Sequence, residues 1–352
     1  MAFSDIPEIS VCGIAACVPA QIIRNAESPL LSETEREQLI PAIGVEERRA
    51  TTDGVCTSDL CFHAAERLIT ELNWDKQEVS WLVFVSQSAD HILPATSCIL
   101  QNRLGLPKTC AAIDISLGCS GWVYGLNTIA ALLKTTKGKG LLLVGDTTTK
   151  LQYFRDKTSF PLFGDAGTAT ALEFDENSAG LKFHLGTDGS GAEAIIIPDG
   201  GFRNPCSPRS FEEFTAPNGA TLTRRHVCMN GMDVFAFAQS QAPKSINALC
   251  ENFGLSAENI DLFVLHQANR ALNERIRAKL KLPLEKVPSS LKTFGNTSSA
   301  SIPLTLVTAC RETLSGKEEP STVIASGFGV GLSVASVFFE TKNTVIPELI
   351  EI

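Results

Sequence analysis

The sequence predicts an α/β fold. Apolar, strand-like runs alternate along the chain with amphipathic helical patterns, as they do in proteins built from strand–helix units. Several runs are apolar on both faces, which is typical of strands covered by helices on each side. With 352 residues and a hydrophobic content of 44%, the chain is long enough to bury a large core in one or two domains.

The expected elements follow one another in chain order. Strands are expected over residues 9–17, 81–86, 111–116, 141–145, 168–174, 262–266, 323–326 and 332–339. Helices are expected over residues 59–72, 122–133, 234–253, 270–280 and 302–314. The less regular stretch 188–225 contains several Pro and Gly residues and is expected to form surface loops.

A weak internal repeat divides the chain. The segment that begins at Gly164 resembles the segment that begins at Gly329. In each, a Gly-rich turn enters a strand, expected at a sheet edge, that ends in an aromatic residue and an acid. The repeat predicts two halves of similar length, 1–175 and 176–352.

Composition excludes several function classes. A formal charge of −9 disfavours nucleic acid as the main partner. The N-terminus lacks the basic and apolar regions of a signal peptide, and the longest nearly apolar run, 327–339, is shorter than the ~18–20 residues of a membrane span. The eleven cysteines are odd in number and include no CxxC pair, so we expect neither a zinc site nor a disulfide framework. Free thiols on this scale fit a protein of the reducing cytoplasm, which is the expected location.

Cys119 is the candidate nucleophile. It lies in residues 113–121, IDISLGCSG, where an expected strand gives way to a helix. Backbone N–H groups and the helix dipole at such a turn can lower a thiol pKa from ~8.5 to ~3.5–7.5. Gly118 and Gly121 would permit a tight, strained turn that exposes the sulfur. The other ten cysteines are expected to be ordinary buried or surface thiols.

His266 and Asn296 are the candidate partners of Cys119. His266 ends an apolar run and continues as LHQAN, whereas Asn296 lies in FGNTSSAS. Turn formation or helix capping is the alternative role for Asn296. A neutral imidazole and an amide can both donate hydrogen bonds to one developing oxyanion, and loss of one such donor typically costs ~3–4 kcal/mol.

These three segments, in this order and spacing, resemble β-ketoacyl-acyl-carrier-protein synthase III, the initiating condensing enzyme of the thiolase superfamily. The resemblance extends over GVEERR at 44–49, LPATSC at 93–98, LFGDAG at 162–167 and MNG at 229–231. It implies a thiolase-like, five-layered αβαβα fold made of two similar halves. It also implies a homodimer, with the segment around Leu93 near the interface.

The resemblance implies a role for each candidate residue. Cys119 would accept the acyl group, and His266 and Asn296 would promote decarboxylation of a malonyl unit and stabilise its enolate. Backbone N–H groups of Cys119 and Val330 would form the other oxyanion hole, with Gly329 as the near alternative to Val330. The acyl donor would be acyl-coenzyme A or an acyl carrier protein, and the second substrate malonyl-carrier protein. Coenzyme A or phosphopantetheine would be a substrate carrier, and neither a metal nor another cofactor is expected.

Substrate binding departs from the family pattern. The Trp and Arg that clamp adenine in acetyl-coenzyme A-dependent members are replaced here by Gln38 and Ala42, and a further Arg by Lys157. The expected substrate-binding residues are Asn230, Asn269, Lys157 and Leu93. Leu93 would reach the acyl pocket from the partner subunit, where a larger residue is frequent in the family.

The helix expected after His266 is basic. It carries Arg270, Arg275, Arg277 and Lys279 against a single acid, Glu274. These four cations are candidates for docking an acidic acyl carrier protein, and a merely solvated helix face is the alternative. Two basic docking positions of the family are Ala236 and Ala271 here.

Three other functions compete with the condensation. The first is a family member repurposed for secondary metabolism, acting as ketosynthase or acyltransferase on a different donor or acceptor. The second is a catalytically silent partner subunit, which the intact Cys119, His266 and Asn296 argue against. The third is a cysteine hydrolase, which would need an activated water, although no acid accompanies His266 in its motif.

Overall fold

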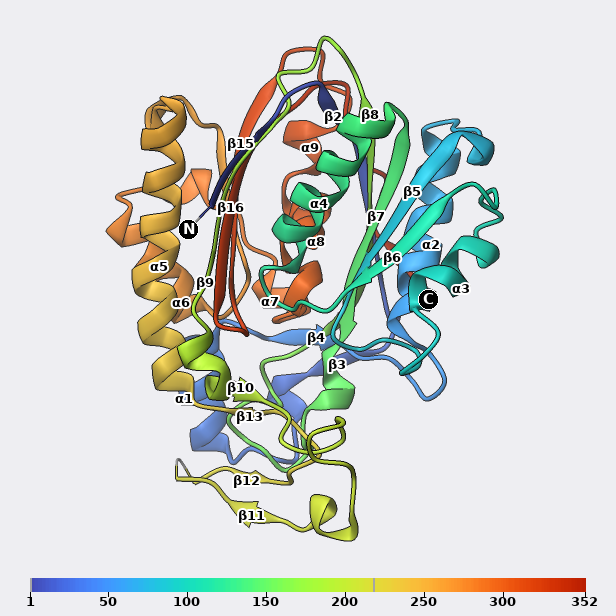
Figure 1. Ribbon diagram of the computed structural model, residues 1–352. Coiled ribbons are helices and arrows are strands. Elements are labelled where there is room, and N and C mark those ends of the chain that lie inside the picture. The colour runs from blue at the N-terminus through green and yellow to red at the C-terminus, as the bar shows by residue number, and fades with distance from the viewer. Residues whose placement is uncertain (1, 218) are drawn as a thin grey trace.

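The computed structural model describes residues 2–217 and 219–352, and it contains two large mixed sheets (Figure 1). The six-stranded sheet has the order β17 (Ile350–Glu351), β2 (Ile9–Val18), β8 (Asp165–Phe174), β7 (Lys139–Thr147), β5 (Val79–Val85), β6 (Ala111–Ile115). The five-stranded sheet has the order β1 (Ala2–Ile6), β9 (Leu181–Thr187), β16 (Ser333–Thr341), β15 (Ser321–Gly329), β14 (Leu262–Leu265).

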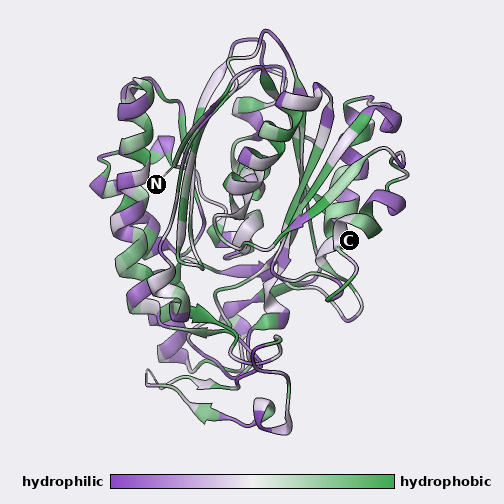
Figure 2. Cartoon of the chain, in the orientation of Figure 1, coloured by the Kyte–Doolittle hydropathy of each residue, from purple (hydrophilic) through white to green (hydrophobic). Residues whose placement is uncertain are grey.

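Helices form three layers around the two sheets, which gives the expected five-layered αβαβα arrangement. Helices α4 (Gly121–Thr136) and α8 (Ser301–Ala309) lie between the sheets (Figure 1). Helices α2 (Thr57–Glu71) and α3 (Thr96–Arg103) cover the outer face of the six-stranded sheet. Helices α5 (Gly231–Phe253) and α6 (Arg270–Lys279) form the layer outside the five-stranded sheet, and hydrophilic stretches alternate with hydrophobic ones along these outer helices (Figure 2).

The two sheets share one pattern of strand directions. In the first, β5 and β7 are parallel, while β7–β8 and β8–β2 are antiparallel. In the second, β14 and β15 are parallel, while β15–β16 and β16–β9 are antiparallel. The repeated segments form β8 and β16, so they occupy equivalent places. Both strands are interior, because each pairs with two neighbours, and the expectation of edge strands was wrong.

Most expected elements are confirmed with shifts of a few residues. The helix expected over 302–314 is divided at Cys310 into α8 and α9 (Arg311–Leu314). Four of the longer strands and α-helices in the described residues were not expected: β1, β9, α3 and α1 (Glu33–Ile43). The remaining short elements are β3 (Ile22–Arg24), β4 (Glu47–Arg49), β10 (Ile195–Ile196), β11 (Phe214–Thr215), β12 (Thr221–Leu222), β13 (Cys228–Met229) and α7 (Leu291–Phe294).

Helix α4 carries the core between the two sheets. It is apolar around most of its circumference because both of its sides are covered. Trp122 links its first turn to both sheets: the indole N–H donates to Thr170 Oγ1 on β8 at 3.0 Å, and the ring packs edge-on against Phe339 on β16. The start of α4, and with it the turn that holds Cys119, is therefore fixed relative to both sheets.

Candidate active site

Cys119 lies in the turn between β6 and α4. The Gly121 N–H donates to the Gly118 carbonyl at 2.6 Å, which closes the turn. Neither glycine has a positive φ, so the expected backbone strain is absent. Gly118 is required for close packing, because a Cβ there would lie 2.5 Å from Gln87 Oε1 and 2.6 Å from Val330 Cγ1.

The turn after β15 covers the sulfur from the opposite side. Gly329 has a φ of +153°, and a Cβ at this position would lie 2.7 Å from Cys119 Sγ. The backbone N–H groups of Val330 and of Cys119 itself lie close enough to the sulfur to lower the pKa of the thiol and so favour the thiolate. The structure thus brings both predicted backbone donors to the sulfur.

The acidity of Cys119 differs from the expectation. Burial raises the pKa of the Cys119 thiol to about 11, and the nearby Asp146 carboxylate raises it further. Hydrogen bonds from Val330, Cys119 and Ser298 lower the pKa but do not offset the burial. The expectation of a lowered pKa was wrong because it considered the helix terminus and not the tertiary packing around Cys119, which leaves this residue only partly exposed.

His266 follows β14 and is buried, with 1% of its surface exposed. Its backbone N–H donates to the Ser326 carbonyl at 2.8 Å, and its ring packs edge-on against Phe328. Burial lowers the pKa of His266 to about 3, although a backbone hydrogen bond at Ser298 opposes this shift. The imidazole is therefore neutral at physiological pH.

A hydroxyl sets the orientation of the imidazole. Ser301 Oγ lies 2.6 Å from His266 Nδ1 and accepts a hydrogen bond from the Gln267 N–H at 3.4 Å. Since Gln267 supplies the hydroxyl oxygen with a donor, the Ser301 proton is available to Nδ1. This arrangement favours the tautomer with the proton on Nε2, which can then donate to a ligand in the cavity.

Asn296 is held by backbone and side chain together. Its backbone N–H donates to the Leu162 carbonyl at 2.9 Å, and its carbonyl accepts from the Gly164 N–H at 3.0 Å. Its side-chain Oδ1 accepts from the Ser298 N–H at 2.9 Å, and its Nδ2 donates to the Ala268 carbonyl at 3.3 Å. The amide oxygen is thereby used within the turn, which directs the amide N–H group toward the cavity.

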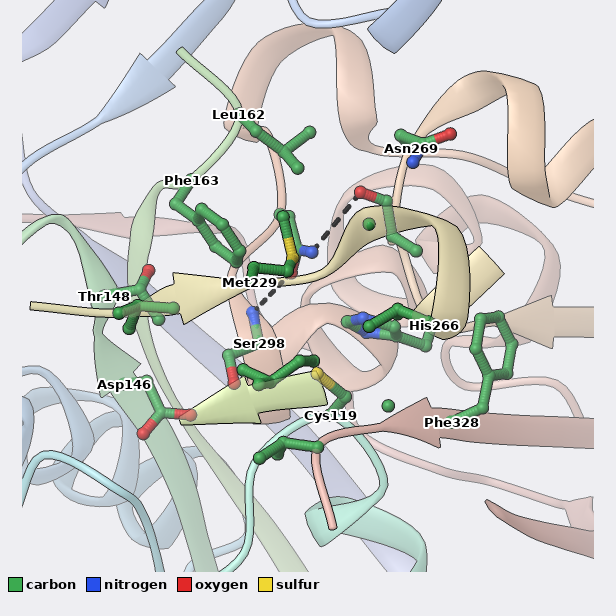
Figure 3. A pocket seen from close by; sticks show the side chains of 18 of the residues that line it. Cys119, Asp146, Thr148, Leu162, Phe163, Met229, His266, Asn269, Ser298 and Phe328 are labelled. Atoms are coloured by element: carbon green, nitrogen blue, oxygen red, sulfur yellow. Dashed lines mark hydrogen bonds between the residues drawn. The ribbon is translucent and has the colours of Figure 1, made fainter. Parts of the chain in front are cut away.

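Cys119, His266 and Asn296 line one cavity of about 130 Å³. Figure 3 shows the Cys119 sulfur beside the His266 ring, and Phe163 and Met229 line the same cavity. The cavity walls are mainly apolar, and residues of β10 and β13 help to close it. The cavity can hold a small acyl group next to a thiol, an imidazole and an amide.

The four predicted substrate-binding residues lie in different places. Asn269 lines the cavity and caps α6 by accepting from the Leu272 N–H at 2.9 Å. Asn230 caps α5 and lines a neighbouring apolar cavity instead. Lys157 Nζ donates to Glu35 Oε1 at 2.9 Å, which with other hydrogen bonds lowers the pKa of Glu35 to about 2. Leu93 is 78% exposed. Lys157 and Leu93 do not line the cavity, so their roles stay predictions.

The basic helix α6 begins at the cavity and continues along the surface. Arg275 and Arg270 are exposed, and Arg270 packs on Gly44. Arg277 is less available because it forms an ion pair with Glu274. Lys279 donates to the Gln239 carbonyl at 3.3 Å. Of the four predicted docking residues, Arg270 and Arg275 thus present the more accessible charges.

Several residues that line the cavity had no predicted role, among them Asp146, Ser298 and Phe328. Asp146 follows the apolar run of β7, as His266 follows β14, so the rule that pointed to His266 would also have found it. Ser298 lies within FGNTSSAS itself.

Three features of the described residues concern membrane spans, metal sites and disulfides. Within residues 2–217 and 219–352, no helix is long and apolar enough to cross a bilayer. In the same residues no group of three or more His, Cys, Asp or Glu side chains is arranged to hold a metal ion. All eleven cysteines are free thiols.

Comparisons with known proteins agree with this geometry. Residues 113–189 match the 3-oxoacyl-[acyl-carrier-protein] synthase III family, and residues 250–341 match the C-terminal family of the same enzyme. A β-ketoacyl-[acyl-carrier-protein] synthase III of Oceanobacillus iheyensis is 32% identical over 332 residues, covering 94% of this chain and 97% of the relative. One from Rhodopirellula baltica is 31% identical, covering 95% of this chain and 99% of the relative.

A solved structure extends the likeness to the whole fold. The 3-oxoacyl-(acyl-carrier protein) synthase from Burkholderia xenovorans LB400 superposes with a TM-score of 0.92 at 35% identity, covering 100% of this chain and 99% of the other. The chain therefore belongs to the β-ketoacyl-acyl-carrier-protein synthase III family of thiolase-superfamily condensing enzymes.

Proposed function

We propose that this protein is a Cys-dependent acyltransferase that condenses an acyl group with malonyl-carrier protein in fatty acid or related biosynthesis. The observation that carries the proposal is the meeting of Cys119, His266 and Asn296, from three distant segments, in one cavity. Family membership supports the same reaction.

In the first half-reaction, Cys119 Sγ attacks the thioester carbonyl and the carrier thiol leaves. The oxyanion of the tetrahedral intermediate would accept hydrogen bonds from the backbone N–H groups of Cys119 and Val330, which already point at the sulfur. The acyl group then remains on Cys119 while the carrier departs, as in other ping-pong mechanisms.

In the second half-reaction, a malonyl thioester loses carbon dioxide and its enolate attacks the acyl-Cys119 carbonyl. His266 Nε2–H and Asn296 Nδ2–H would donate to the thioester oxygen on which negative charge develops. Both donors are neutral, and the low pKa of about 3 keeps His266 neutral throughout the useful pH range. Because the cavity is largely apolar, these hydrogen bonds are stronger than they would be in water.

The partners follow from the same scheme. The donor would be acyl-coenzyme A or an acyl carrier protein, and phosphopantetheine would be a substrate arm rather than a resident cofactor. Arg270 and Arg275 offer exposed positive charge beside the cavity to an acidic carrier protein. We also propose a homodimer, which would cover the adjacent, highly exposed Ile92 and Leu93. A cytoplasmic location stays a prediction.

A second candidate function is acyl transfer or condensation with another donor or acceptor in secondary metabolism. Lys157 supports it, because its ammonium group is paired with Glu35 and lacks the planar face of the clamping Arg. Product analysis with malonyl-carrier protein against malonyl-coenzyme A and other acceptors would separate the two functions.

Intact-protein mass spectrometry tests the proposal directly. The protein and Cys119→Ala are incubated with a panel of acyl-coenzyme A and acyl-carrier thioesters. We expect a mass gain of one acyl group in the unsubstituted protein and none in Cys119→Ala. A protein that no donor acylates, or an adduct that survives in Cys119→Ala, would contradict the assignment of the nucleophile.

A further inference from the structure

Asp146 is a buried carboxylate at the end of β7, and it lines the cavity of Cys119. Its Oδ1 accepts from the Gln87 N–H at 2.7 Å and from Ser86 Oγ at 3.1 Å. Its Oδ2 accepts from Ser299 Oγ at 2.6 Å and from the Ser299 N–H at 3.2 Å. No Lys, Arg or His side chain of the described residues forms an ion pair with it. Burying a carboxylate without a cation costs free energy of folding, and such groups are typical of functional sites.

The Ser298 hydroxyl lies between this carboxylate and the nucleophile. Figure 3 shows Ser298 between Asp146 and Cys119. The Ser298 side chain lies close enough to both groups to lower the pKa of the Asp146 carboxyl and the pKa of the Cys119 thiol. Ser298 has a positive φ of 52°, an uncommon conformation for a serine, and its N–H is fixed by Asn296 Oδ1. The backbone therefore places the Ser298 side chain between the two groups.

Acylation of Cys119 requires an acceptor for the thiol proton. Burial raises the pKa of Cys119 to about 11, so little thiolate forms spontaneously at neutral pH. Burial also lowers the pKa of His266 to about 3, which makes its imidazole a poor proton acceptor. In contrast, burial raises the pKa of Asp146, and a more basic carboxylate is a better acceptor.

We propose that Ser298 and Asp146 form a proton relay that deprotonates Cys119 during acyl transfer. The proposal rests on the function proposed above, and it adds two residues to the acylation step. Ser298 lies beside the reacting sulfur, whereas Asp146 acts on the sulfur through Ser298.

The relay balances within the protein and its substrate. As Cys119 Sγ forms its bond to the thioester carbonyl carbon, the thiol proton moves to Ser298 Oγ and the Ser298 proton moves to Asp146. When the tetrahedral intermediate collapses, the bond to the carrier sulfur breaks. The departing thiolate regains a proton along the same route, and Asp146 returns to its carboxylate form.

Few other titratable groups face this relay. His266 faces the cavity from the end of β14 and is neutral. Cys61, on α2, is near enough to Asp146 for the carboxylate to raise its pKa, but burial is the larger cause and keeps Cys61 a thiol. The charge that acts on Cys119 is therefore that of Asp146.

Two rates measured on each variant test the relay. The first is alkylation of Cys119 by iodoacetamide as a function of pH, which reports the equilibrium amount of thiolate. The second is single-turnover acylation by the best acyl-coenzyme A donor at pH 7, followed by mass. The variants are Asp146→Asn, Ser298→Ala and, as the matched control for loss of a buried carboxylate, Asp165→Asn. Asp165 is bound by Thr51 and Thr149 and does not line the cavity.

The relay predicts opposite changes in Asp146→Asn. Loss of the negative charge should move the alkylation midpoint to lower pH, while loss of the acceptor should slow acylation about 100-fold, the lower end of general-base effects. Ser298→Ala should slow acylation similarly and move the alkylation midpoint to higher pH. Asp165→Asn should leave the alkylation midpoint unchanged.

Each result decides between the alternatives. Acylation of Asp146→Asn at the normal rate, or a parallel fall of acylation and alkylation in this variant, would overturn the relay and leave the proposed function intact. If Asp146→Asn does not fold, a normal acylation rate in Ser298→Ala overturns the relay on its own, and a fall of about 100-fold supports it. Failure of the unsubstituted protein to accept an acyl group from any donor would overturn both proposals.

Discussion

The burial of a neutral His266 should make the stability of the protein fall in acid. In the folded state the pKa of His266 is about 3, whereas an unfolded His has a pKa of 6.5. Below pH 6.5 the unfolded chain binds a proton at this residue and the folded protein does not. Protonation therefore favours unfolding, and stability is lost as the pH falls from 6.5 toward 3.

The size of this effect follows from the two pKa values. At pH 5 the solution is 1.5 units below the ordinary pKa of 6.5 and well above the folded value. At about 1.36 kcal/mol per unit, the unfolded state gains about 2 kcal/mol from this one site relative to pH 8. His266→Gln removes the site, so its stability relative to the unsubstituted protein should improve by about 2 kcal/mol between pH 8 and pH 5.

Urea unfolding at several pH values measures this difference. Comparing the two proteins at each pH cancels the contributions of all other titrating groups, and His63→Gln, on the exposed side of α2, controls for loss of an imidazole as such. A stability difference between His266→Gln and the unsubstituted protein that does not change with pH would refute the reasoning, because it would mean that folding does not shift the pKa of His266.

Three further predictions concern other parts of the site. Gly329→Ala places a methyl group 2.7 Å from Cys119 Sγ, so it should lower the free energy of unfolding by ~1–3 kcal/mol and block acylation. Thermal unfolding measures the first effect and intact mass the second, and normal acylation would contradict the geometry. Ser301→Ala removes the donor to His266 Nδ1 and should slow malonyl decarboxylation ~10–100-fold without slowing acylation; equal loss in both steps would contradict a role through His266. Arg275→Glu should raise the apparent KM for carrier-bound substrate about two- to fivefold at low salt, and an unchanged KM there would remove the docking hypothesis.

The central residues of the site were predictable because each follows an apolar run. Cys119 and His266 come after β6 and β14, which belong to different sheets, and sites in α/β proteins tend to form from polar residues beyond the carboxyl ends of strands. Asn296 required the motif, since it follows the short helix α7 and is held by backbone contacts from the distant segment at Leu162. No local pattern encodes that contact.

Strand β9, helix α1 and the acidity of Cys119 were not predictable, because each depends on tertiary packing that has no local sequence pattern. Strand β9 was missed because Lys182 and His184 interrupt its apolar pattern, and α1 was missed because none of its residues is buried. The acidity of Cys119 was misjudged for a related reason. The helix terminus is a local feature, whereas burial of the sulfur depends on Gly329, more than two hundred residues away.

The two ends of the chain are exchanged between the sheets. β1, from the N-terminus, pairs with β9 in the sheet built from the second half, while β17, from the C-terminus, pairs with β2 in the other sheet. During synthesis β1 must therefore wait for β9 to leave the ribosome, and β2 must wait for β17, which is made more than three hundred residues later. Loss of Ile350 and Glu351 would thus leave β2 as an open edge, where another chain could pair and start aggregation.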